Sequence, residues 1–367
     1  MKKKIMFAFG TRPEAIKMCP LILECRNRPA SFDVLVCITS QHVEMLTPQL
    51  EYFKVTPDYD LALMKEEQTL TDVNVGVLTK LGPVLDREKP DILLVHGDTT
   101  TTFASALAAF YRQIPVGHVE AGLRTYNMAS PYPEEFNRQA AGILASYHFA
   151  PTEWTARNLI NEGKDPARVF VTGNTVIDAI KSTVSASYAH PELDWASDSK
   201  LILITAHRRE NLGDPMRRMF SAIRRIIDDH PHTKAIYPIH MNPAVRRIAD
   251  EYLTDHERIH LIEPLGVFDF HNFMSRCHII LTDSGGLQEE GSAVNKPVLL
   301  MRDTTERPEG IEAGVVDMVG TDADAIYAAV SRLLNDQSRY DKMINAVNPF
   351  GDGSASKRIA DILEEIL

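Results

Sequence analysis

Short apolar runs alternate with helical patterns along this chain of 367 residues. The runs are near-continuous in Val, Ile and Leu, which is typical of strands that are buried on both faces of a sheet. This repeated strand–helix–strand order predicts parallel sheets. The first six predicted strands are Lys4–Phe9, Asp33–Thr39, Ile92–Val95, Val116–Val119, Tyr147–Ala150 and Val169–Thr172. The next six are Leu201–Thr205, Ala235–Ile239, Ile259–Ile262, Ile279–Thr282, Val298–Met301 and Val315–Val319.

Twelve strands are unusual in a single sheet, so we predict two open sheets of about six strands each. The length of the chain also favours two domains over one core. The polar, weakly periodic stretch TVSASYAHPELDWASDSK places the break between the sheets near residues 170–198. The predicted fold class is therefore α/β with two parallel sheets.

Charge and composition exclude several classes of function. The formal net charge of −11 makes a nucleic acid or an anionic membrane surface a poor partner. The four cysteines form no CxxC pair, which favours free thiols in a reducing cytoplasm. The N-terminal apolar run Ile5–Phe9 is too short for a signal peptide, and no stretch approaches the length of a membrane span. We therefore expect a cytoplasmic protein with no membrane partner.

Polar residues follow the predicted strands at their carboxyl ends. In the first series these are Gly10-Thr11-Arg12, His96-Gly97-Asp98 and His118-Val119-Glu120. In the second series they are Ala206-His207-Arg208, then His240, then Asp283-Ser284-Gly285-Gly286. Open parallel sheets bind ligands outside these ends. Two such sheets facing each other would bring these groups into one cleft.

The segment TDSGGLQEE is the best single candidate for a phosphate site. Two glycines allow close backbone approach, and the N–H groups of a following helix would favour an anion. Glu290 could accept hydrogen bonds from ribose hydroxyls. A plain strand–turn–helix junction, with Ser284 as the N-cap, fits the same letters.

Other motifs allow two interpretations each. Arg12 and Lys17 in FGTRPEAIKM could neutralise a phosphate or could sit in a solvated helix start. Asp98 and Glu120, each two residues after a histidine, could bind a metal, but no dense ligand cluster accompanies them. Residues 99–102 could cap the next helix and leave Asp98 free.

Three further patterns bear on cofactors and metals. The sequence has no GxGxxG after a strand and no Walker A loop, so we expect no bound cofactor. Asp322-Ala323-Asp324 resembles a metal-binding DxD of some glycosyltransferases but is more simply a helix cap. We predict no metal site.

Nine motifs occur in one order from the N-terminus to the C-terminal part of the chain. They are FGTRPEAIKM, TSQHVEML, HGDTTTT, PVGHVEAGLRT, SPYPEEFNR, GNTVIDA, TAHRREN, LTDSGGLQEE and RDTTERPEG. Together they closely resemble the non-hydrolysing UDP-N-acetylglucosamine 2-epimerases of bacteria. The resemblance implies the GT-B architecture, in which two Rossmann-like domains with parallel sheets face a central cleft. It implies an N-terminal domain of residues 1–170 plus a returning C-terminal helix, 353–367, and a UDP-binding domain of residues 171–352.

The resemblance also assigns site residues. Asp98, Glu120 and Glu134 match the catalytic carboxylates, and Arg138 and His207 match catalytic or UDP-stabilising cations. The residues that match substrate contacts are Arg12, Lys17, Phe270, Ser284, Gly285, Gly286, Glu290 and Arg307. Of these, the Ser284–Gly286 turn and Glu290 match the diphosphate and ribose contacts, and Phe270 is placed by the uracil.

Some bacterial members of this family also bind a second UDP-GlcNAc as an allosteric activator. The residues that match this second site are Gln41, Glu134, Arg208 and His240. Glu44 and Glu67 stand where the family pattern has Gln and Arg. Because two acids replace a cation and a neutral group beside a diphosphate sugar, we predict weaker binding of the activator.

The implied reaction interconverts UDP-GlcNAc and UDP-ManNAc by elimination of UDP to 2-acetamidoglucal and its re-addition. The product would supply ManNAc for cell-surface polysaccharide, and the resemblance implies a homodimer. A GT-B glycosyltransferase acting on a UDP-sugar, a hydrolysing epimerase and a catalytically silent nucleotide-sugar sensor are the alternatives. Which of the three carboxylates serves which face of C2 stays open.

The segment SPYPEEFNR contains two adjacent carboxylates. If a helix begins near Glu134, then Glu134 and Arg138 share one face. Glu135 is turned away from that face by the helical repeat. The resemblance places only Glu134 and Arg138 at the family's active-site positions, so we expect Glu134→Gln to abolish most activity and Glu135→Gln to be mild.

Overall fold

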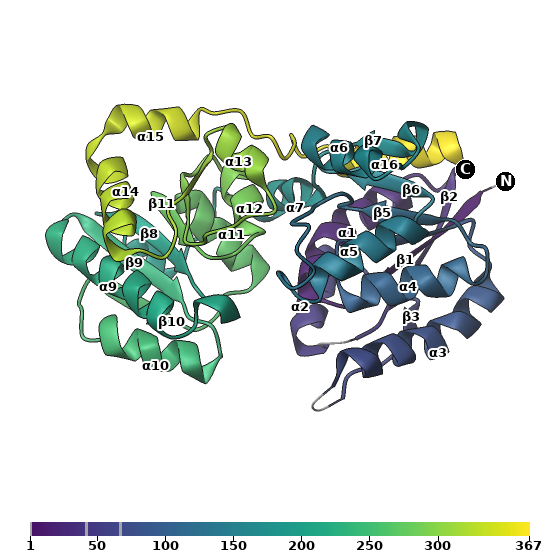
Figure 1. Cartoon of the computed structure of the whole chain (residues 1–367), viewed down its shortest axis with the longest axis horizontal. Helices are drawn as coiled ribbons and strands as arrows, with labels where there is room; N and C mark the ends of the chain where they lie inside the picture. The colour runs from purple at the N-terminus through teal and green to yellow at the C-terminus, as the bar shows by residue number, and fades with distance from the viewer. Residues whose placement is uncertain (1, 41–42, 66–67) are drawn as a thin grey trace. The chain divides into compact units, whose positions relative to one another are not determined.

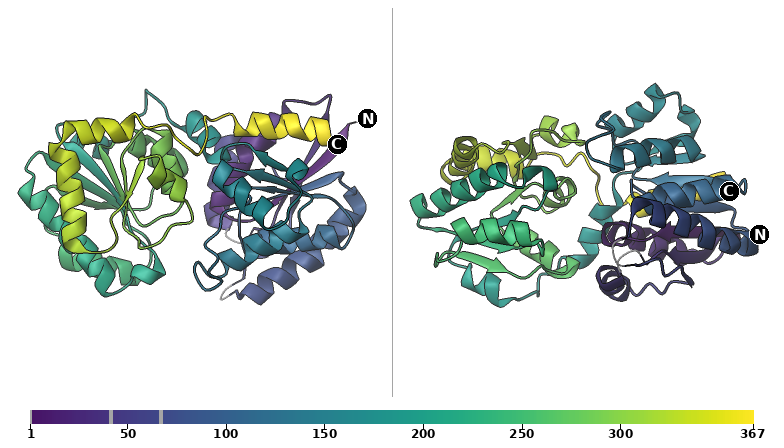
Figure 2. Two further views of the ribbon diagram at one scale, coloured as in Figure 1. Left: turned by 45° about the horizontal axis from the view of Figure 1, so that its top comes forward. Right: turned by 60° about the horizontal axis from the view of Figure 1, so that its bottom comes forward.

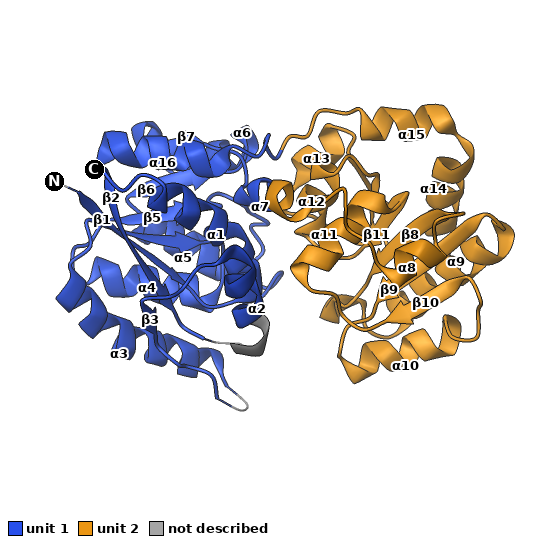
Figure 3. Cartoon of the chain, turned by 180° about the vertical axis from the view of Figure 1, so that it is seen from behind, with its two compact units in different colours: residues 1–179, 350–367 blue, residues 180–349 orange. Residues whose placement is uncertain are grey.

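The computed structural model describes residues 2–40, 43–65 and 68–367, without the side chains of residues 43–45. The described chain forms two compact α/β units (Figure 3). Unit 1 is Met1–Ala179 with Phe350–Leu367, and unit 2 is Ile180–Pro349. Figure 1 follows the chain from strand β1 (Lys3–Phe9) to the C-terminal helix α16 (Ala355–Ile366), which both belong to unit 1.

Seven strands form one parallel sheet in the described part of unit 1, in the order β3-β2-β1-β4-β5-β6-β7. After β1 they are β2 (Phe32–Ile38), β3 (Tyr59–Asp60), β4 (Ile92–His96), β5 (Val116–Val119), β6 (Tyr147–Ala150) and β7 (Val169–Val171). The six predicted strands of this half are confirmed. The sequence did not reveal β3, because two residues are too few to show any periodicity.

Helices lie on both faces of this sheet (Figure 2). They are α1 (Arg12–Arg26), α2 (Val43–Phe53), α3 (Leu70–Glu88), α4 (Thr100–Phe110), α5 (Glu134–Leu144), α6 (Glu153–Asn161), the short η1 (Pro166–Arg168), α7 (Thr175–Thr183) and α16. Helix α1 packs against α2 and α16, whereas α4 packs against α3 and α5. The boundary between the two units falls within α7.

Unit 2, which is described throughout, contains a six-stranded parallel sheet in the order β10-β9-β8-β11-β12-β13. Its strands are β8 (Lys200–Thr205), β9 (Thr233–Pro238), β10 (Ile259–Ile262), β11 (Ile279–Thr282), β12 (Val298–Leu300) and β13 (Val316–Met318). Its helices are α8 (Pro191–Trp195), η2 (Arg209–Asn211), α9 (Asp214–Asp229), α10 (Pro243–Tyr252), α11 (Val267–Arg276), α12 (Leu287–Ala293), α13 (Pro308–Glu312), α14 (Ala323–Asn335) and α15 (Gln337–Ile344). All six predicted strands of this half are confirmed.

The C-terminal helix α16 is part of unit 1. The carboxylate of Asp178 accepts hydrogen bonds from the first two backbone N–H groups of α16, those of Ala355 and Ser356. These are N–H groups that lack a partner within the helix itself. The guanidinium of Arg28, just beyond α1, pairs with Asp361 and Glu364 on α16. Figure 2 shows α16 lying along this unit.

The helix caps agree with two interpretations made from the sequence and contradict a third. Thr99 caps α4 by accepting from the Thr102 N–H at 3.0 Å, and Asp322 caps α14 instead of forming a metal motif. The alternative interpretation of Ser284 as an N-cap does not hold, because α12 starts only at Leu287, with Gly286 at the N-cap position. No helix of the described chain is both long and apolar enough to span a membrane.

Gly122 and Gly163 both have positive φ but differ in the space around them. Alanine substitutions at the two positions therefore test how tightly the chain packs after β5. Gly122 (φ 91°) lies two residues after Glu120, and a Cβ there would be 2.2 Å from the carbonyl oxygen of Thr155. A Cβ added to Gly163 (φ 83°) would meet nothing within 4 Å. We expect Gly163→Ala to lower the free energy of unfolding by about 1–2 kcal/mol, the cost of the left-handed backbone alone. Gly122→Ala should cost clearly more in urea unfolding, and equal losses would contradict this.

Candidate active site

Strands β1, β4 and β5 are parallel neighbours, so their carboxyl ends meet at one edge of the unit 1 sheet. Arg12 is the first residue of α1, directly after the β1 end, while Asp98 follows β4 and Glu120 follows β5. The sheet therefore gathers the predicted residues of this half at one edge.

Glu120 is the centre of a buried polar cluster. The Lys17 side chain extends from α1 and forms a close ion pair with Glu120 Oε2, and both residues are at least nine-tenths buried. Asn174 Nδ2 donates to the same oxygen at 2.7 Å, and His96 Nε2 lies 3.8 Å from it. Desolvating two opposite charges is tolerable only with such close pairing and added hydrogen bonds.

The backbone conformation of Glu120 is also unusual. Its φ of 61° lies in the left-handed region, which costs about 1–2 kcal/mol for a residue with a side chain. Such conformations persist where surrounding contacts enforce them, and they cluster at functional sites. At Gly97, on the neighbouring β4 loop, an added Cβ would lie 3.5 Å from Glu120 Oε1. The two strand-end loops thus approach closely at Glu120.

The two histidines of this edge are buried and neutral. Burial lowers the pKa of His96 to about 3, although the charge of Glu120 acts to raise it. Burial likewise lowers the pKa of His118 to about 4. His118 Nε2 makes a 2.7 Å contact with the carbonyl oxygen of Gly97. Within the described ranges, no group of three His, Cys, Asp or Glu side chains is arranged to hold a metal ion.

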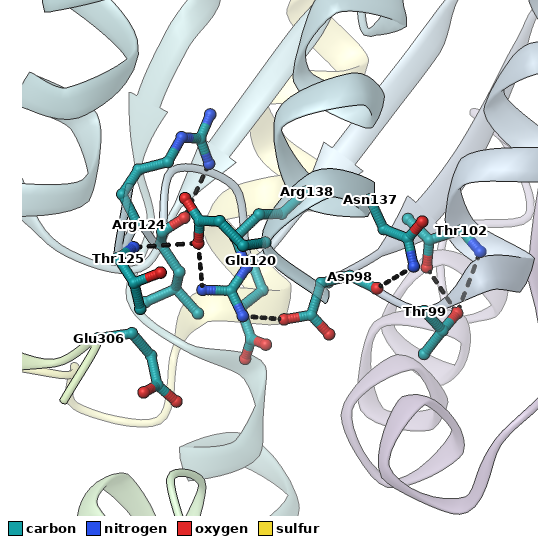
Figure 4. Close-up of polar contacts among 12 residues, drawn as sticks. Asp98, Thr99, Thr102, Glu120, Arg124, Thr125, Asn137, Arg138 and Glu306 are labelled. Atoms are coloured by element: carbon teal, nitrogen blue, oxygen red, sulfur yellow. Dashed lines mark hydrogen bonds and ion pairs between the residues drawn. The ribbon is translucent and has the colours of Figure 1, made fainter. Parts of the chain in front are cut away.

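Arg138 pairs with Asp98 at the end of β4. The guanidinium extends from α5 and donates from Nη2 to Asp98 Oδ2 (Figure 4). Arg138 is only 4% exposed, whereas the Asp98 side chain is about one-quarter exposed. The neighbouring Asn137 Nδ2 donates to the backbone oxygen of Asp98 at 3.0 Å. Helix α5 thus fixes both the side chain and the backbone of Asp98.

The helix α5 begins at Glu134, so the predicted helix start is confirmed. Glu134 is half-buried and lies one turn before Arg138 on the same face. The ion pair between Arg138 and Asp98 therefore joins the end of β4 to the face of α5 that carries Glu134.

Glu135 is not the spare carboxylate that we expected. It is fully buried and accepts from the backbone N–H groups of Thr125 and Tyr126, each at 3.0 Å. Its Oε2 also lies 3.3 Å from Arg138 Nη1. The premise for a mild Glu135→Gln is therefore wrong: this carboxylate holds both the loop before α5 and the guanidinium that binds Asp98.

Glu14 has an analogous role at the β1 end. This buried carboxylate accepts from the backbone N–H groups of Gly10 and Thr11, at 3.0 and 2.8 Å. It also accepts from the hydroxyls of Thr99 and Thr102, at 2.8 and 3.2 Å. Glu14 thereby ties the loop that carries Arg12 to the loop that carries Asp98.

In unit 2, Asp283 organises the edge where the paired strands β8 and β11 end. It is fully buried and accepts from the backbone N–H groups of His207 and Arg208, each at 2.9 Å. Asn211 Nδ2 donates to it at 3.1 Å. The carboxylate therefore fixes the loop after β8 against the turn Ser284–Gly286.

His207 and His240 stack with ring centroids 5.2 Å apart. Burial lowers the pKa of His207 below its ordinary 6.5, although Asp283 acts to raise it. The imidazole is therefore mainly neutral at pH 7, whereas the resemblance placed His207 among the cations. A bound diphosphate would favour the protonated form again.

The Ser284–Gly286 turn is closely surrounded by charged groups. A Cβ on Gly285 would lie 2.4 Å from Glu306 Oε1, 3.1 Å from Arg307 Nη1 and 3.4 Å from Arg208 Nη2. Arg307 is buried and pairs with Glu289 and Glu306. These carboxylates hold the guanidinium beside the turn.

The remaining predicted residues of this half lie on two helices. Phe270 is a half-buried residue of α11, and Glu290 lies on α12 with its Oε2 3.5 Å from His271 Nε2. Gln41, Glu67 and the side chain of Glu44 lie outside the described residues, so the predicted activator site is described only at Glu134, Arg208 and His240.

Sequence reasoning missed the residues that hold the site in place. Glu14, Glu135, Asn174 and Asp283 all lie inside the motifs quoted above, but nothing local distinguishes a supporting carboxylate from a reacting one. The available signal was position: each stands within a few residues of a predicted strand end or helix start.

Comparisons with known proteins agree on one family. A family model described as UDP-N-acetylglucosamine 2-epimerase matches residues 23–364. The chain is 55% identical over 364 residues to the UDP-N-acetylglucosamine 2-epimerase of Bacillus subtilis (strain 168), covering 99% of this chain and 96% of that relative.

Two solved structures are similar over almost the whole chain. The UDP-GlcNAc 2-epimerase from Neisseria meningitidis, bound to UDP-GlcNAc, has a TM-score of 0.93 and 46% identity, covering 99% of this chain and 100% of that one. A co-structure of S. aureus MnaA with UDP has a TM-score of 0.93 and 51% identity, covering 99% and 96%.

The contacts of Glu135 predict a pH-dependent contribution to stability. Burial acts to raise the pKa of Glu135, but donors led by the Thr125 N–H, together with Arg138, outweigh it and lower the pKa below its ordinary 4.5. Glu135→Gln should lower the free energy of unfolding at pH 7 by about 1–3 kcal/mol, because one N–H partner is lost.

A carboxylate with a lowered pKa stabilises the fold above its unfolded pKa, and this contribution is lost as the pH falls through the folded pKa. The difference between parent and Glu135→Gln in urea unfolding should therefore be full at pH 7 and narrow below about pH 4.5. A difference that stays constant down to pH 3, or no difference at pH 7, would contradict this role.

Proposed function

The chain belongs to the non-hydrolysing bacterial family of UDP-N-acetylglucosamine 2-epimerases, and we propose that it inverts C2 by eliminating UDP and adding it back. The reaction interconverts UDP-GlcNAc and UDP-ManNAc. The observation that carries the mechanism is the arrangement at one sheet edge of unit 1. There two carboxylates, Asp98 and Glu120, are each paired with a buried cation.

Elimination is the route that the chemistry of the sugar favours. The C2 proton is not beside a carbonyl, so simple deprotonation is very costly. When a base removes this proton, its C–H electron pair forms the C1=C2 double bond and the C1–O pair leaves with UDP. The product is 2-acetamidoglucal. UDP then attacks C1 again while a proton is added to the opposite face of C2.

Removal and return of the proton on opposite faces favour two different acid/base groups. Unit 1 supplies Asp98, Glu120 and Glu134 for these two roles. Arg138 and Lys17 are fixed beside two of these carboxylates before substrate binds. Such preorganised charges need no rearrangement during the reaction, which is the main source of electrostatic catalysis.

Unit 2 is proposed to bind the UDP portion. The backbone of the Ser284–Gly286 turn, with Arg208 and Arg307 beside Gly285, suits a diphosphate that gains charge as it leaves. Glu290 would accept from the ribose hydroxyls, and Phe270 would lie by the uracil. Arg12 of unit 1 and His207 would add positive charge when UDP departs. We propose no cofactor and no metal for any of these steps.

Three further properties are proposed from the resemblance. We propose a homodimer that works in the cytoplasm, which agrees with four buried free thiols among the described residues, and that supplies ManNAc for cell-surface polysaccharide. We also propose that a second UDP-GlcNAc activates this chain weakly, because Glu44 and Glu67 replace the Gln and Arg of the family pattern for the activator site.

Isotope exchange tests the elimination route. UDP-GlcNAc alone, incubated with the enzyme in D2O, should give UDP-ManNAc that carries deuterium at C2, because the removed proton exchanges with solvent before a proton is returned. NMR of the sugar products measures this directly. Product that keeps its original C2 hydrogen would refute elimination. Bulk release of free ManNAc and UDP would indicate a hydrolysing enzyme, and turnover only with an added acceptor would indicate a glycosyltransferase.

Glu134→Gln tests the chemical role of α5. The loss of a proton-transferring group should lower kcat by about 100-fold or more, while the melting temperature stays near that of the parent. Glu153→Gln is the matched control, because Glu153 is also the first residue of a helix in unit 1 and is exposed. It should keep normal turnover. Near-parental kcat in Glu134→Gln would assign Glu134 a structural role only.

A further inference from the structure

We propose that His271 is a positioning residue, through which Thr183 orients the carboxylate of Glu290 for the ribose hydroxyls of UDP. The inference rests on the proposed function, because it concerns how the nucleotide of the UDP-sugar is held. It adds a residue to that function, since His271 belongs to none of the groups placed at the reacting sugar.

His271 lies between Thr183 and Glu290 within unit 2. Its ring, on α11, is 1% exposed. Nδ1 is 2.6 Å from the hydroxyl oxygen of Thr183, and Nε2 is 3.5 Å from Glu290 Oε2. The Thr183 side chain is itself fully buried. Both nitrogens of the imidazole are therefore directed at defined polar atoms and away from solvent.

The network assigns the proton positions of His271. The hydroxyl of Thr183 has one hydrogen, and the carbonyl oxygen of Ile180, at 3.2 Å, is farther from it than Nδ1 of His271, at 2.6 Å. The hydroxyl therefore donates to Nδ1, and the neutral ring carries its hydrogen on Nε2, toward Glu290. In this tautomer the Nε2–H is directed at the carboxylate of Glu290.

The helix that carries His271 is fixed by the next residue. Asn272 Nδ2 donates to the carbonyl oxygens of Thr183 and Phe268, at 2.9 and 2.8 Å. Its Oδ1 accepts from the backbone N–H of Ser185 at 2.9 Å. The imidazole therefore has little freedom to turn or shift, and it can hold Glu290 in one orientation.

Glu290 stands close to the Ser284–Gly286 turn. Its backbone N–H donates to the carbonyl oxygen of Gly286 at 3.2 Å, and its Oε1 lies 3.7 Å from the place of a Cβ on Gly286. The carboxylate thus bends back over the turn that is proposed to hold the diphosphate. With Oε2 facing His271, the group is oriented before UDP binds. A side chain ordered in advance loses less rotamer entropy on binding, which raises affinity.

The test separates positioning from general support of the fold. Isothermal titration calorimetry would measure UDP and 2′,3′-dideoxy-UDP, which lacks both ribose hydroxyls, against the full-length parent, His271→Ala, Glu290→Gln and the double variant. His271→Ala should weaken UDP binding by about tenfold, as is typical when a residue that orients a ligand-contacting group is removed. Binding of the dideoxy nucleotide should not change, and the double variant should bind UDP no worse than Glu290→Gln.

Two further variants, one conservative substitution and one control, complete the test. His271→Gln retains an N–H donor and should recover part of the UDP affinity, which also covers the case that His271→Ala does not fold. His278→Ala removes another histidine of unit 2, whose ring stacks on Tyr340, and should leave both affinities unchanged.

Equal weakening of both nucleotides in the His271 variants, or no weakening of either, would overturn the proposal. A parent enzyme that binds the two nucleotides equally well would overturn it as well, because Glu290 would then not read the ribose. The same parent sample is assayed for conversion of UDP-GlcNAc. If conversion is normal, the proposed function stands and only the positioning fails, whereas loss of conversion would refute the proposed function itself.

Discussion

The ammonium of Lys17 and the carboxylate of Glu120 form an ion pair that is almost completely removed from water. Removing one partner of such a pair typically costs about 3–5 kcal/mol, because the other charge is left uncompensated. The contact joins α1 to the end of β5, Asn174 adds the segment before α7, and His96 adds β4. Three segments distant in the sequence therefore converge on the carboxylate of Glu120, whose backbone lies in the left-handed region.

The carboxylates of this protein fall into two groups by the donors that they face. Glu14, Glu135 and Asp283 are buried, and each accepts from two backbone N–H groups of a neighbouring loop. Asp98 and Glu120 are each paired with a side-chain cation, and Glu135 of the first group also lies 3.3 Å from Arg138 Nη1. The first group fixes loops, and the second is the pair that we propose for acid and base chemistry. Each unit contains a loop-fixing carboxylate beside the residues to which the reaction is assigned.

Local signals in the sequence were sufficient for both sheets. The strands β5, β6, β10 and β11 have the predicted bounds, since a strand buried on both faces is a contiguous apolar run. The strand β3 was missed because it is only two residues long and pairs only with the end of β2. The alternative in which Ser284 caps a helix came from residue type, yet α12 starts only at Leu287, and the Ser284 N–H donates to the hydroxyl of Thr282 at the end of β11. The motif order identified the family, and with it the residues at the strand ends.

The sequence by itself determined the α/β class, the two sheets, the family and the set of residues at the sheet edges. These properties depend on local periodicity and on motifs that can be read along the chain. The tertiary structure alone decided which carboxylate of Glu134 and Glu135 is buried, and that Glu14 and Asp283 hold loops. It also decided that His271 lies between Thr183 and Glu290. The Glu14–Thr102 and Thr183–His271 contacts each join residues that are 88 positions apart. The loop-fixing carboxylates also accept from backbone N–H groups, which carry no residue-specific signal. A hydrogen bond between distant segments leaves no periodicity in either of them.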